Sequence, residues 1–538
     1  MLLEIFHDLP LPLIVSLGVL LSVWSWRLWM FTVRPWIWPS LPRELPYWIP
    51  FIGHTIGFAR NADKVIEHGL DFTNRAYEPF SVQLLGTKFY IVTSPDDVTA
   101  VFRNTDSLTF DGHLKVLLQN FGVKPKAFDK AWHKPQPGDW CYIPNNPINP
   151  GQLDLIHFVE ETYKKQLLSG DHVDTLSQAF IQSLLTNLDW DHIDFGCNVF
   201  LWGATQNFEP RGEISQFPSH HASLYSICQF FIVEATARSL FGDLLHDIEP
   251  DIVNLMLQFN EHVWMIVFNY PSFFASPVAE SRQKIMAALK KLVQTPEEDK
   301  SQLCWAIRNI TAAMDIVDID VESRASMMLM SFWAAISNEY NASFWVLAYL
   351  LHDISLLEQV KQETEAAWFD GSLDLKYLSA NCPLLNSTFH EVLRVKNGAG
   401  ALRVVTKDTR IGQKHLKAGN SIMIPFRQLH VNKNVWGPKF AEFDPYRFLS
   451  KKSLARHPSF RPFGGGLTYC PGRMLAREQV FGFVAILLHR FTIKLAQIPG
   501  GQSFPRFNDL TPSLGISGPI KGMDVIISIE KANEKFPV

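Results

Sequence analysis

The sequence predicts a mainly α protein with a smaller β-rich part, preceded by a transmembrane helix at the N-terminus. Three observations lead to this fold class. Residues 11–33 form an almost uninterrupted apolar run. Apolar side chains recur with helical periodicity from residue 153 to about 396. Beyond Ala399 the chain consists of short strand-like pieces and turns, with one more predicted helix near 474–491.

The composition excludes several classes of protein. Of 538 residues, 47% are hydrophobic, so the chain buries enough apolar surface to fold and is not disordered. The formal net charge is only −4, which argues against a dedicated nucleic-acid binder. The cysteines form no CxxC pair, which argues against a disulfide framework and against a clustered zinc site. They are Cys141, Cys197, Cys228, Cys304, Cys382 and Cys470.

The apolar run predicts a membrane anchor. A helix over Leu11–Val33 is about 34 Å long, enough to cross about 30 Å of hydrocarbon. Its one internal charge is Arg27, and Arg34 and Arg43 follow it, so the excess of basic residues places the downstream body in the cytoplasm. A cleaved signal peptide is the alternative, but the run is too long for one and lacks a small-residue cleavage site.

The sequence predicts that the chain has three parts. We expect an anchor over residues 1–34, a stiff and extended proline-rich hinge over 35–53, and one body over 54–538. Short strands are predicted at 81–85 and 89–92. Six prolines between 124 and 150 predict a long loop.

The most specific motif surrounds Cys470. A glycine-rich turn at 463–466 leads to this cysteine, and a predicted helix follows at once. Glycines allow a flat cofactor to approach the backbone, and the N–H groups of a helix N-terminus stabilise a thiolate. A thiolate on an iron porphyrin favours O–O cleavage. A buried structural cysteine is the alternative reading, whereas a phosphate loop would need Lys-Ser/Thr after the glycines.

This segment resembles the haem-binding loop of the cytochrome P450 haem-thiolate monooxygenases, F-x-x-G-x-[RH]-x-C-x-G. Phe463, Gly466, Cys470 and Gly472 match that pattern. Thr468 stands where the family has Arg or His, which removes one expected partner of a haem propionate. The resemblance implies haem b (iron protoporphyrin IX) as the cofactor, with Cys470 as the axial ligand of the iron.

A second motif lies on the predicted helix that carries Glu391 and Arg394. These residues share one helix face, and a surface ion pair is the plain alternative. A zinc site is excluded because Arg394 replaces the second histidine of H-E-x-x-H. The pair resembles the family's E-x-x-R motif, which implies a structural network completed by Arg447 from a P-x-R-F element. These motifs and Cys470 follow one another in family order.

Between these motifs lies Arg403, which the resemblance assigns to a haem propionate, since arginine recognises carboxylates well. A solvated strand arginine is the alternative. The proline-rich hinge also matches the membrane-bound members, so the resemblance covers most of the chain.

Residues 332–345 resemble the long helix that crosses the distal face of the haem. Ala334 and Ala335 would leave room for oxygen. The family's usual [DE]-T pair is replaced by Ser337-Asn338. We expect Asn338 to hold a water, and Glu339 to supply acidity if the helix is locally distorted. The alternatives are a substrate that carries its own oxygen, or an Asn338 that only satisfies a backbone group.

Asn338 and the following Phe-Trp pair resemble the branch of sterol 7α- and 12α-hydroxylases and prostacyclin synthase. The resemblance implies a monooxygenase that hydroxylates a lipophilic sterol-, terpenoid- or secondary-metabolite-like substrate with O2. NADPH–cytochrome P450 reductase would supply the electrons, and a single-pass endoplasmic reticulum anchor would leave the body in the cytoplasm. Two alternatives stay open: a reductase-independent isomerase or dehydratase acting on a peroxide, and a haem- or lipid-binding membrane protein without turnover.

The substrate envelope is the least explicit part of the sequence. By family position, residues 397–402 and 514–516 would line it, and both are mostly small or apolar. Residues 228–233 are aromatic-rich and would roof the pocket, enter the membrane or belong to the core. A basic group near the cysteine would dock an electron donor or be solvated surface. It comprises Lys451, Lys452, Arg456, Arg461, Arg473 and Arg477.

Overall fold

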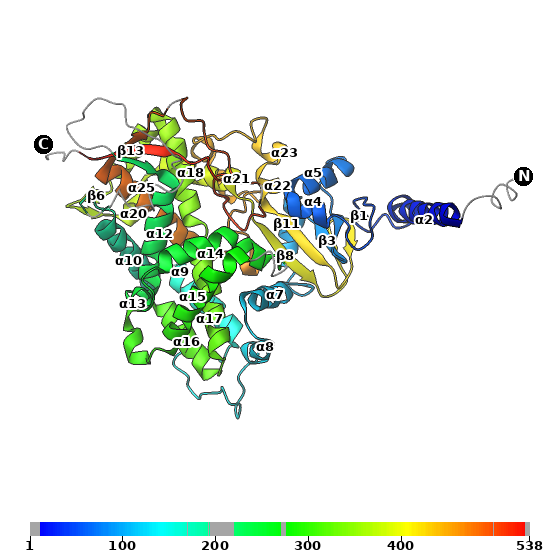
Figure 1. The fold of residues 1–538 in the computed structure, drawn as a ribbon, viewed down its shortest axis with the longest axis horizontal. Helices are drawn as coiled ribbons and strands as arrows, with labels where there is room; N and C mark the ends of the chain where they lie inside the picture. Colours follow the sequence, from blue (N-terminus) through cyan, green and yellow to red (C-terminus); the bar gives the residue numbers. More distant parts are fainter. Residues whose placement is uncertain are drawn as a thin grey trace, which may run out of the picture.

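The structure is a computed structural model, and it describes residues 11–168, 170–191, 193, 220–270, 276–498, 500–509 and 511–532. The first ten residues of the predicted anchor, Cys197 and the last six residues lie outside this part. Figure 1 shows a broad body from which one helix projects at the N-terminal end. Most of the body is helical, and a smaller sheet lies on the side nearest the projecting helix. The predicted fold class is confirmed.

The projecting helix consists of α2 (Leu11–Leu28), a π-helical turn η1 (Trp29–Val33) and α3 (Arg34–Ile37). The 26 residues Pro12–Ile37 are long and apolar enough to cross a membrane. The helix therefore continues past the predicted end at Val33. Pro35 lies directly after the π-helical turn, in the first turn of the short helix α3, a position that proline tolerates.

The predicted hinge over 35–53 is extended only in part. After the turn at 39–41, strand β1 (Arg43–Glu44) pairs in parallel with β2 (Phe80–Leu84). The N–H of Leu45 also donates to the carbonyl of Ser81 at 2.9 Å. The segment is therefore an edge of the main sheet and not a free connector, because its backbone groups find partners there.

The main sheet has the order β1-β2-β3-β11-β8-β4. Strand β11 pairs in parallel with β3 and antiparallel with β8, so the sheet joins the N-terminal part of the chain to the part after residue 400. The predicted strands at 81–85 and 89–92 are confirmed to within two residues. The remaining bounds are β3 (Thr87–Ile91), β4 (Leu108–Thr109), β8 (Gly400–Val405) and β11 (Ser421–Pro425).

In the described residues, three smaller sheets complete the β part. One has the order β12-β13-β5, and two are hairpins. Their strands are β5 (His220–Ser223), β6 (Trp368–Phe369), β7 (Ser372–Leu373), β9 (Thr409–Ile411), β10 (Lys414–Leu416), β12 (Phe491–Leu495) and β13 (Ile526–Lys531).

Helices dominate between residues 153 and 396, as predicted. The first half of the chain holds α4 (Thr55–Arg60), α5 (Ala62–Phe72), α6 (Pro95–Arg103), α7 (Asp111–Phe121), α8 (Pro125–Ala131), α9 (Leu155–Leu167), α10 (Asp171–Asn187), α12 (Leu224–Phe241), α13 (Leu244–Ile248) and α14 (Ile252–Val267). The second half holds α15 (Ser276–Gln294), η2 (Glu297–Gln302), α16 (Trp305–Ile316), α17 (Val321–Ile336), α18 (Glu339–His352), α19 (Ile354–Glu365), α20 (Leu375–Asn381), α21 (Pro383–Lys396), α22 (Phe426–His430), α23 (Lys433–Trp436), α24 (Arg447–Ser450), η3 (Lys452–Arg456), η4 (Gly466–Thr468) and α25 (Arg473–Arg490).

Helices α12, α18 and α25 lie in the main hydrophobic core and are buried on nearly every side. A helix that is apolar all round is typical of such a position. The aromatic-rich residues 228–233 belong to this core, and four of the six are buried: Cys228, Phe231, Ile232 and Val233. The predicted loop at 124–150 is a loop only after α8, which begins at Pro125 in the position that proline favours.

Candidate active site

The loop over residues 463–472, which we call the cysteine loop, is shaped by its glycines. Gly464 and Gly466 adopt φ angles of 82° and 63°, a region that side chains other than glycine rarely tolerate. A Cβ at Gly466 would also lie 2.9 Å from the carbonyl oxygen of Phe102. The N–H of Cys470 donates to the carbonyl of Phe463 at 3.0 Å, which closes the turn just before α25. The local sequence therefore positions one thiol at the start of a long buried helix.

The thiol of Cys470 lies on the wall of a cavity of about 900 Å³. Burial raises its pKa to about 11, while the N–H groups of Gly472 and Arg473 act in the opposite direction. A thiol that coordinates a metal loses its proton outright. A Cβ at Gly472 would lie 3.8 Å from the Cys470 sulfur, in ordinary van der Waals contact with it. Ala334 and Ala335 line the same cavity.

Arg403 on β8 supplies a buried positive charge to this cavity. Its side chain donates to the carbonyl of Leu402 and, at 2.6 Å, to the hydroxyl of Thr468. Only 6% of the residue is exposed, and no carboxylate forms an ion pair with it in the part of the chain that the structure describes. A buried cation needs a counter-charge. The residues present therefore fit haem, with a thiol for the iron and an unpaired guanidinium for a propionate.

The predicted network of Glu391, Arg394 and Arg447 is assembled. Arg394 donates to both carboxylate oxygens of Glu391, at 2.8 and 2.6 Å, and both residues are 0% exposed. Arg447 donates to Glu391 Oε1 at 3.0 Å. The remaining N–H groups of Arg394 reach three backbone carbonyls, those of His430, Phe440 and Glu442. A surface ion pair is therefore excluded, because Glu391 and Arg394 are both fully buried.

This network extends to the cysteine loop through His430. Its carbonyl accepts a bond from Arg394, and its ring Nε2 accepts the N–H of Arg461 at 3.0 Å. Burial, together with the neighbouring Arg394 charge, lowers the pKa of His430 to about 3, so the ring is neutral and Nε2 can act as an acceptor. Asn397 donates to the carbonyl of Pro462 at 2.9 Å. The network therefore holds the segment that leads into the turn before Cys470.

The helix expected over 332–345 is interrupted. α17 ends at Ile336 and α18 begins at Glu339, leaving Ser337 and Asn338 between them. The amide of Asn341 donates to the Ser337 carbonyl at 3.1 Å, which satisfies one group that the interruption leaves free. The local distortion on which the prediction for Glu339 depended is therefore present.

Asn338 and Glu339 both line the cavity. Asn338 Oδ1 accepts the backbone N–H of Ile516 at 2.8 Å, and its amide donates to the Ser337 hydroxyl at 2.9 Å. Glu339 accepts the N–H of Asn338 at 3.2 Å. Burial raises the pKa of Glu339 to about 7. Much of the Asn338 side chain is thus engaged with neighbouring groups, and Glu339 is the side chain of the pair that can hold a proton near neutral pH.

The expected substrate envelope lies on this cavity. Residues 397–402 and 514–516 all line it, as the family position implied. The sequence did not reveal why residue 515 is glycine: a Cβ there would collide with Asn338 Oδ1. The core residues at 228–233 are absent from the described lining, so roofing of the pocket by this segment is not supported.

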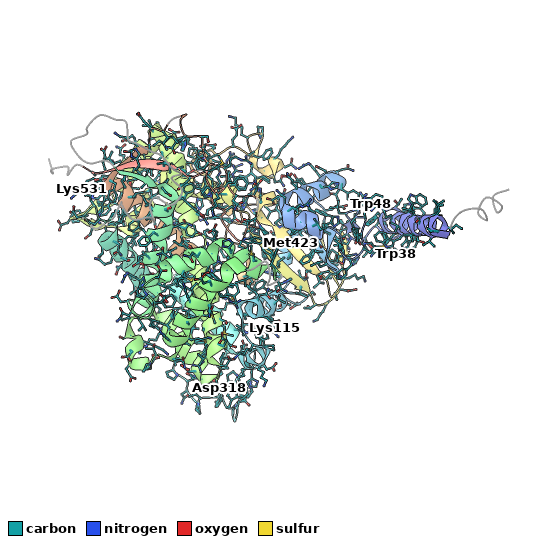
Figure 2. All side chains as sticks on the ribbon, viewed as in Figure 1. Trp38, Trp48, Lys115, Asp318, Met423 and Lys531 are labelled. Atoms are coloured by element: carbon teal, nitrogen blue, oxygen red, sulfur yellow. The ribbon has the colours of Figure 1, made fainter. Side chains whose placement is uncertain are left out.

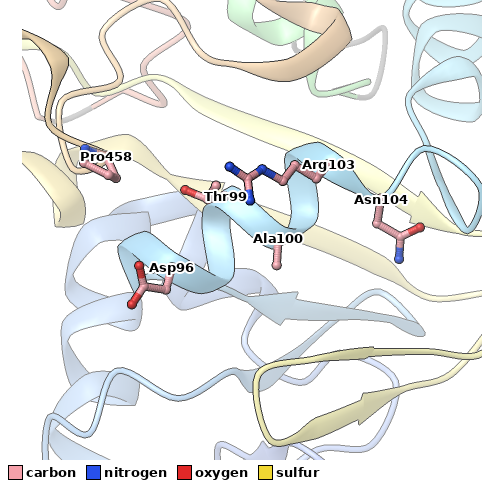
Figure 3. A pocket seen from close by; sticks show the side chains of 6 residues that line it. All are labelled: Asp96, Thr99, Ala100, Arg103, Asn104 and Pro458. Carbon is pink, nitrogen blue, oxygen red and sulfur yellow. The ribbon is translucent and has the colours of Figure 1, made fainter.

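The six basic residues near the cysteine do not form one solvated face. Lys451, Lys452 and Arg456 are exposed. Arg461 is partly buried and donates to the Thr99 hydroxyl, and Arg477 donates to the carbonyl of Ser379. A separate hollow lies over α6, and its lining includes Thr99, the residue that accepts this bond from Arg461 (Figure 3). It is separate from the cavity that holds the thiol, and its lining residues are Asp96, Thr99, Ala100, Arg103, Asn104 and Pro458.

Replacement of Arg394 by lysine tests the network. Lysine cannot make the bidentate contact or reach all three carbonyls, so buried acceptors lose their donors. We expect Arg394→Lys to lower the free energy of unfolding by about 3–5 kcal/mol and to reduce the haem retained per chain. Thermal unfolding measures the loss of stability, and haem absorbance measures the haem retained per chain. The exposed Arg410→Lys is the control, and equal stability of the two variants would contradict the role of the network.

The comparisons with known proteins agree with this geometry. Residues 217–515 match the family model for cytochrome P450. The cytochrome P450 monooxygenase poxD of Penicillium oxalicum is 25% identical over 88% of this chain and 92% of its own length. The human 7-alpha-hydroxycholest-4-en-3-one 12-alpha-hydroxylase is 22% identical over 86% of this chain and 87% of its own length.

Among solved structures, the cyanobacterial CYP120A1 with bound retinoic acid superposes with a TM-score of 0.63 at 17% identity, covering 92% of this chain and 99% of that one. This likeness concerns the fold. The family match covers more than half of the chain and includes the cysteine loop. The chain therefore belongs to the cytochrome P450 family, as a haem b-dependent monooxygenase that receives electrons from NADPH through a reductase.

Proposed function

We propose that the enzyme hydroxylates or otherwise oxidises a lipophilic sterol-, terpenoid- or secondary-metabolite-like molecule, with electrons from NADPH–cytochrome P450 reductase. The observation that carries this proposal is the cavity of about 900 Å³ that contains Cys470 and is lined mainly by apolar and small residues. Apolar and small residues make up most of this lining, which suits a lipophilic molecule better than a hydrophilic one. The names of the relatives support the same class, since one acts on a steroid and others are fungal monooxygenases.

We expect haem and the residues around the cavity to have separate roles. Bound haem would supply the activation of O2 and the insertion of one oxygen atom into the substrate. Cys470 would hold the haem iron through its thiolate, and Gly466 and Gly472 would let the ring approach the backbone. Phe463 closes the turn before Cys470 through its carbonyl, and Arg403 would pair with a propionate. The network of Glu391, Arg394 and Arg447 would keep the cysteine loop in place without taking part in the chemistry.

Glu339 and Asn338 would manage protons on the distal side in place of the usual acid and alcohol. Glu339 holds a proton at a buried carboxyl on the cavity wall, with a pKa of about 7 that suits proton transfer at neutral pH. Asn338 fixes the backbone at the interruption through Ile516 and Ser337. Its second amide hydrogen is left to hold a water beside Glu339.

Turnover with defined electron sources tests the function. We expect product and NADPH consumption when the enzyme, NADPH–cytochrome P450 reductase and a panel of sterols and terpenoids are combined, because oxygen insertion needs two electrons per product. Mass spectrometry of the products, with 18O2 as the label, gives the readout. Conversion of a lipid peroxide without reductase, with no 18O in any product, would instead support the isomerase alternative.

The pH dependence of coupling tests Glu339. The carboxyl is protonated below its pKa of about 7, so the fraction of NADPH electrons recovered in product should fall as pH rises through 7. Glu339→Gln should lower this fraction about tenfold or more at pH 6.5 and make it independent of pH. Glu358→Gln on the exposed face of α19 is the matched control.

Stability gives a second measure of the same group. Folding raises the pKa of Glu339 above its usual value of 4.5, so its stabilising contribution is present at low pH and is lost as pH rises through 7. We expect the Tm of Glu339→Gln, relative to that of the native enzyme, to increase between pH 5 and pH 8. A constant difference across this range would contradict the raised pKa.

We propose that the chain is a single-pass protein of the endoplasmic reticulum, with an anchor over 1–34, a hinge over 35–53 and a cytoplasmic catalytic body over 54–538. The apolar helix Pro12–Ile37 supports anchoring. Exposed tryptophans also lie where this helix meets the body, including Trp38 and Trp48 (Figure 2). Tryptophan is enriched at membrane–water interfaces.

Protease protection tests this topology. Proteinase K added to sealed microsomes should degrade the body, because no membrane separates the two. The sequons at Asn309, Asn341 and Asn386 should be unmodified, and Asn341 is in addition only 5% exposed. A glycan on Asn309 or Asn386, or a body that resists the protease, would contradict the cytoplasmic location.

A further inference from the structure

Lys396, the last residue of α21, is a buried cation that takes no part in the haem binding or proton transfer proposed above. Only 7% of the residue is exposed. No carboxylate forms an ion pair with its ammonium among the residues that the structure describes. Burial and the nearby charge of Arg427 lower its pKa to about 7, so keeping this side chain charged is costly.

Four aromatic rings surround the ammonium. Its Nζ lies 3.8 Å from the ring centre of Trp345 on α18. The centres of Tyr349, Phe504 and Phe507 lie at 5.4, 5.4 and 5.5 Å. A cation over aromatic faces is attracted by their negative electrostatic potential, by about 2 kcal/mol when the pair is desolvated. The rings therefore provide the attraction that a carboxylate would otherwise provide.

The four rings around the ammonium, which we call the cage, come from two elements that are far apart in the chain. Trp345 and Tyr349 belong to the helix that follows the interruption at Asn338. Phe504 and Phe507 belong to the C-terminal segment, where Phe507 also lies 4.3 Å from the guanidinium of Arg427 and lines the cavity. The ammonium thus draws the C-terminal segment towards α18.

Backbone bonds at the same place continue this attachment into the cavity wall. The carbonyl of Lys396 accepts the N–H of Ser517 at 3.1 Å, and the Trp345 indole donates to the Ser517 carbonyl at 2.7 Å. The preceding N–H, that of Ile516, is held by Asn338. Residues 511–517 all line the cavity. This part of the cavity wall is therefore held at two places: Lys396 and Trp345 bond to Ser517, and Asn338 bonds to Ile516.

We propose that Lys396 is a positioning residue for the substrate: its caged ammonium holds residues 504–509 and 511–517 against α18 and so sets the shape of the cavity wall. It acts through Phe507 and Leu514–Ile516, which are apolar or small and suit a rigid lipophilic molecule. An apolar residue would fill the cage without the cost of removing a charge from water. The inference rests on the proposed function only in so far as that wall receives the substrate.

The test compares the haem-loaded native enzyme with Lys396→Met, Lys396→Arg and Lys414→Met at pH 6, where the amine is charged. Lys414 is the matched control, since it is equally buried but pairs with Glu78 at 3.2 Å. Two readouts need neither substrate nor reductase. Hydrogen exchange reports the amides of 504–519, and optical titration compares a biphenyl-substituted imidazole with imidazole itself, both of which ligate the iron.

In Lys396→Met we expect amide exchange in 504–519 and the dissociation constant of the bulky imidazole to rise about tenfold, because the cation–π attraction is lost. Imidazole affinity should be unchanged, and the Tm should not fall. Lys396→Arg, which keeps the cation, should behave like the native enzyme.

Unchanged exchange and bulky-imidazole affinity in Lys396→Met, or equal changes in Lys414→Met, would overturn the proposal. If Lys396→Met retains no haem, Lys396→Gln is judged by the same criteria. These outcomes are independent of whether the enzyme inserts oxygen, so a failure here is distinguishable from a failure of the proposed function.

Discussion

The arrangement of the site depends on one buried carboxylate, that of Glu391, which two guanidinium groups share. Removing these charges from water is expensive, and the cost is offset only because each N–H group of Arg394 finds an acceptor. The same contacts hold the backbone at His430, whose ring holds Arg461. The cysteine loop is therefore fixed from outside by a polar network in which every N–H group of the Arg394 guanidinium has an acceptor, while its own glycines give it room for a flat cofactor.

The region between α17 and α18 is stabilised in a different way. The regular helical hydrogen bonds are interrupted at Ser337 and Asn338, and side chains there bond to neighbouring polar groups instead. The interruption places a buried acid, Glu339, on the cavity wall and ties that wall to the C-terminal segment. Asn338 and Lys396 attach the same segment from two sides, so the groups that would handle protons and those that would orient the substrate are mechanically joined.

Features that depend on local sequence were predictable. The glycine turn, Cys470 and the helix after it lie within a few residues, and Glu391 and Arg394 are three apart on one helix. Even Arg447 could be assigned by resemblance. The interruption of the distal helix was not predictable, because it depends on Ile516, 178 residues away. The Lys396 cage likewise draws its rings from two distant segments. The pairing of Arg43–Glu44 with β2 was also not predictable, because its partners Phe80 and Ser81 lie on a separate strand.

The optical spectrum of the reduced, CO-bound enzyme tests thiolate ligation by Cys470. A thiolate ligand donates electron density to the iron and shifts the Soret band of the CO complex to longer wavelength than a histidine ligand does. We expect this red-shifted band in the native enzyme and its loss in Cys470→His. A native enzyme that binds haem and CO without the shift, or a Cys470→His variant that keeps it, would exclude Cys470 as the thiolate ligand.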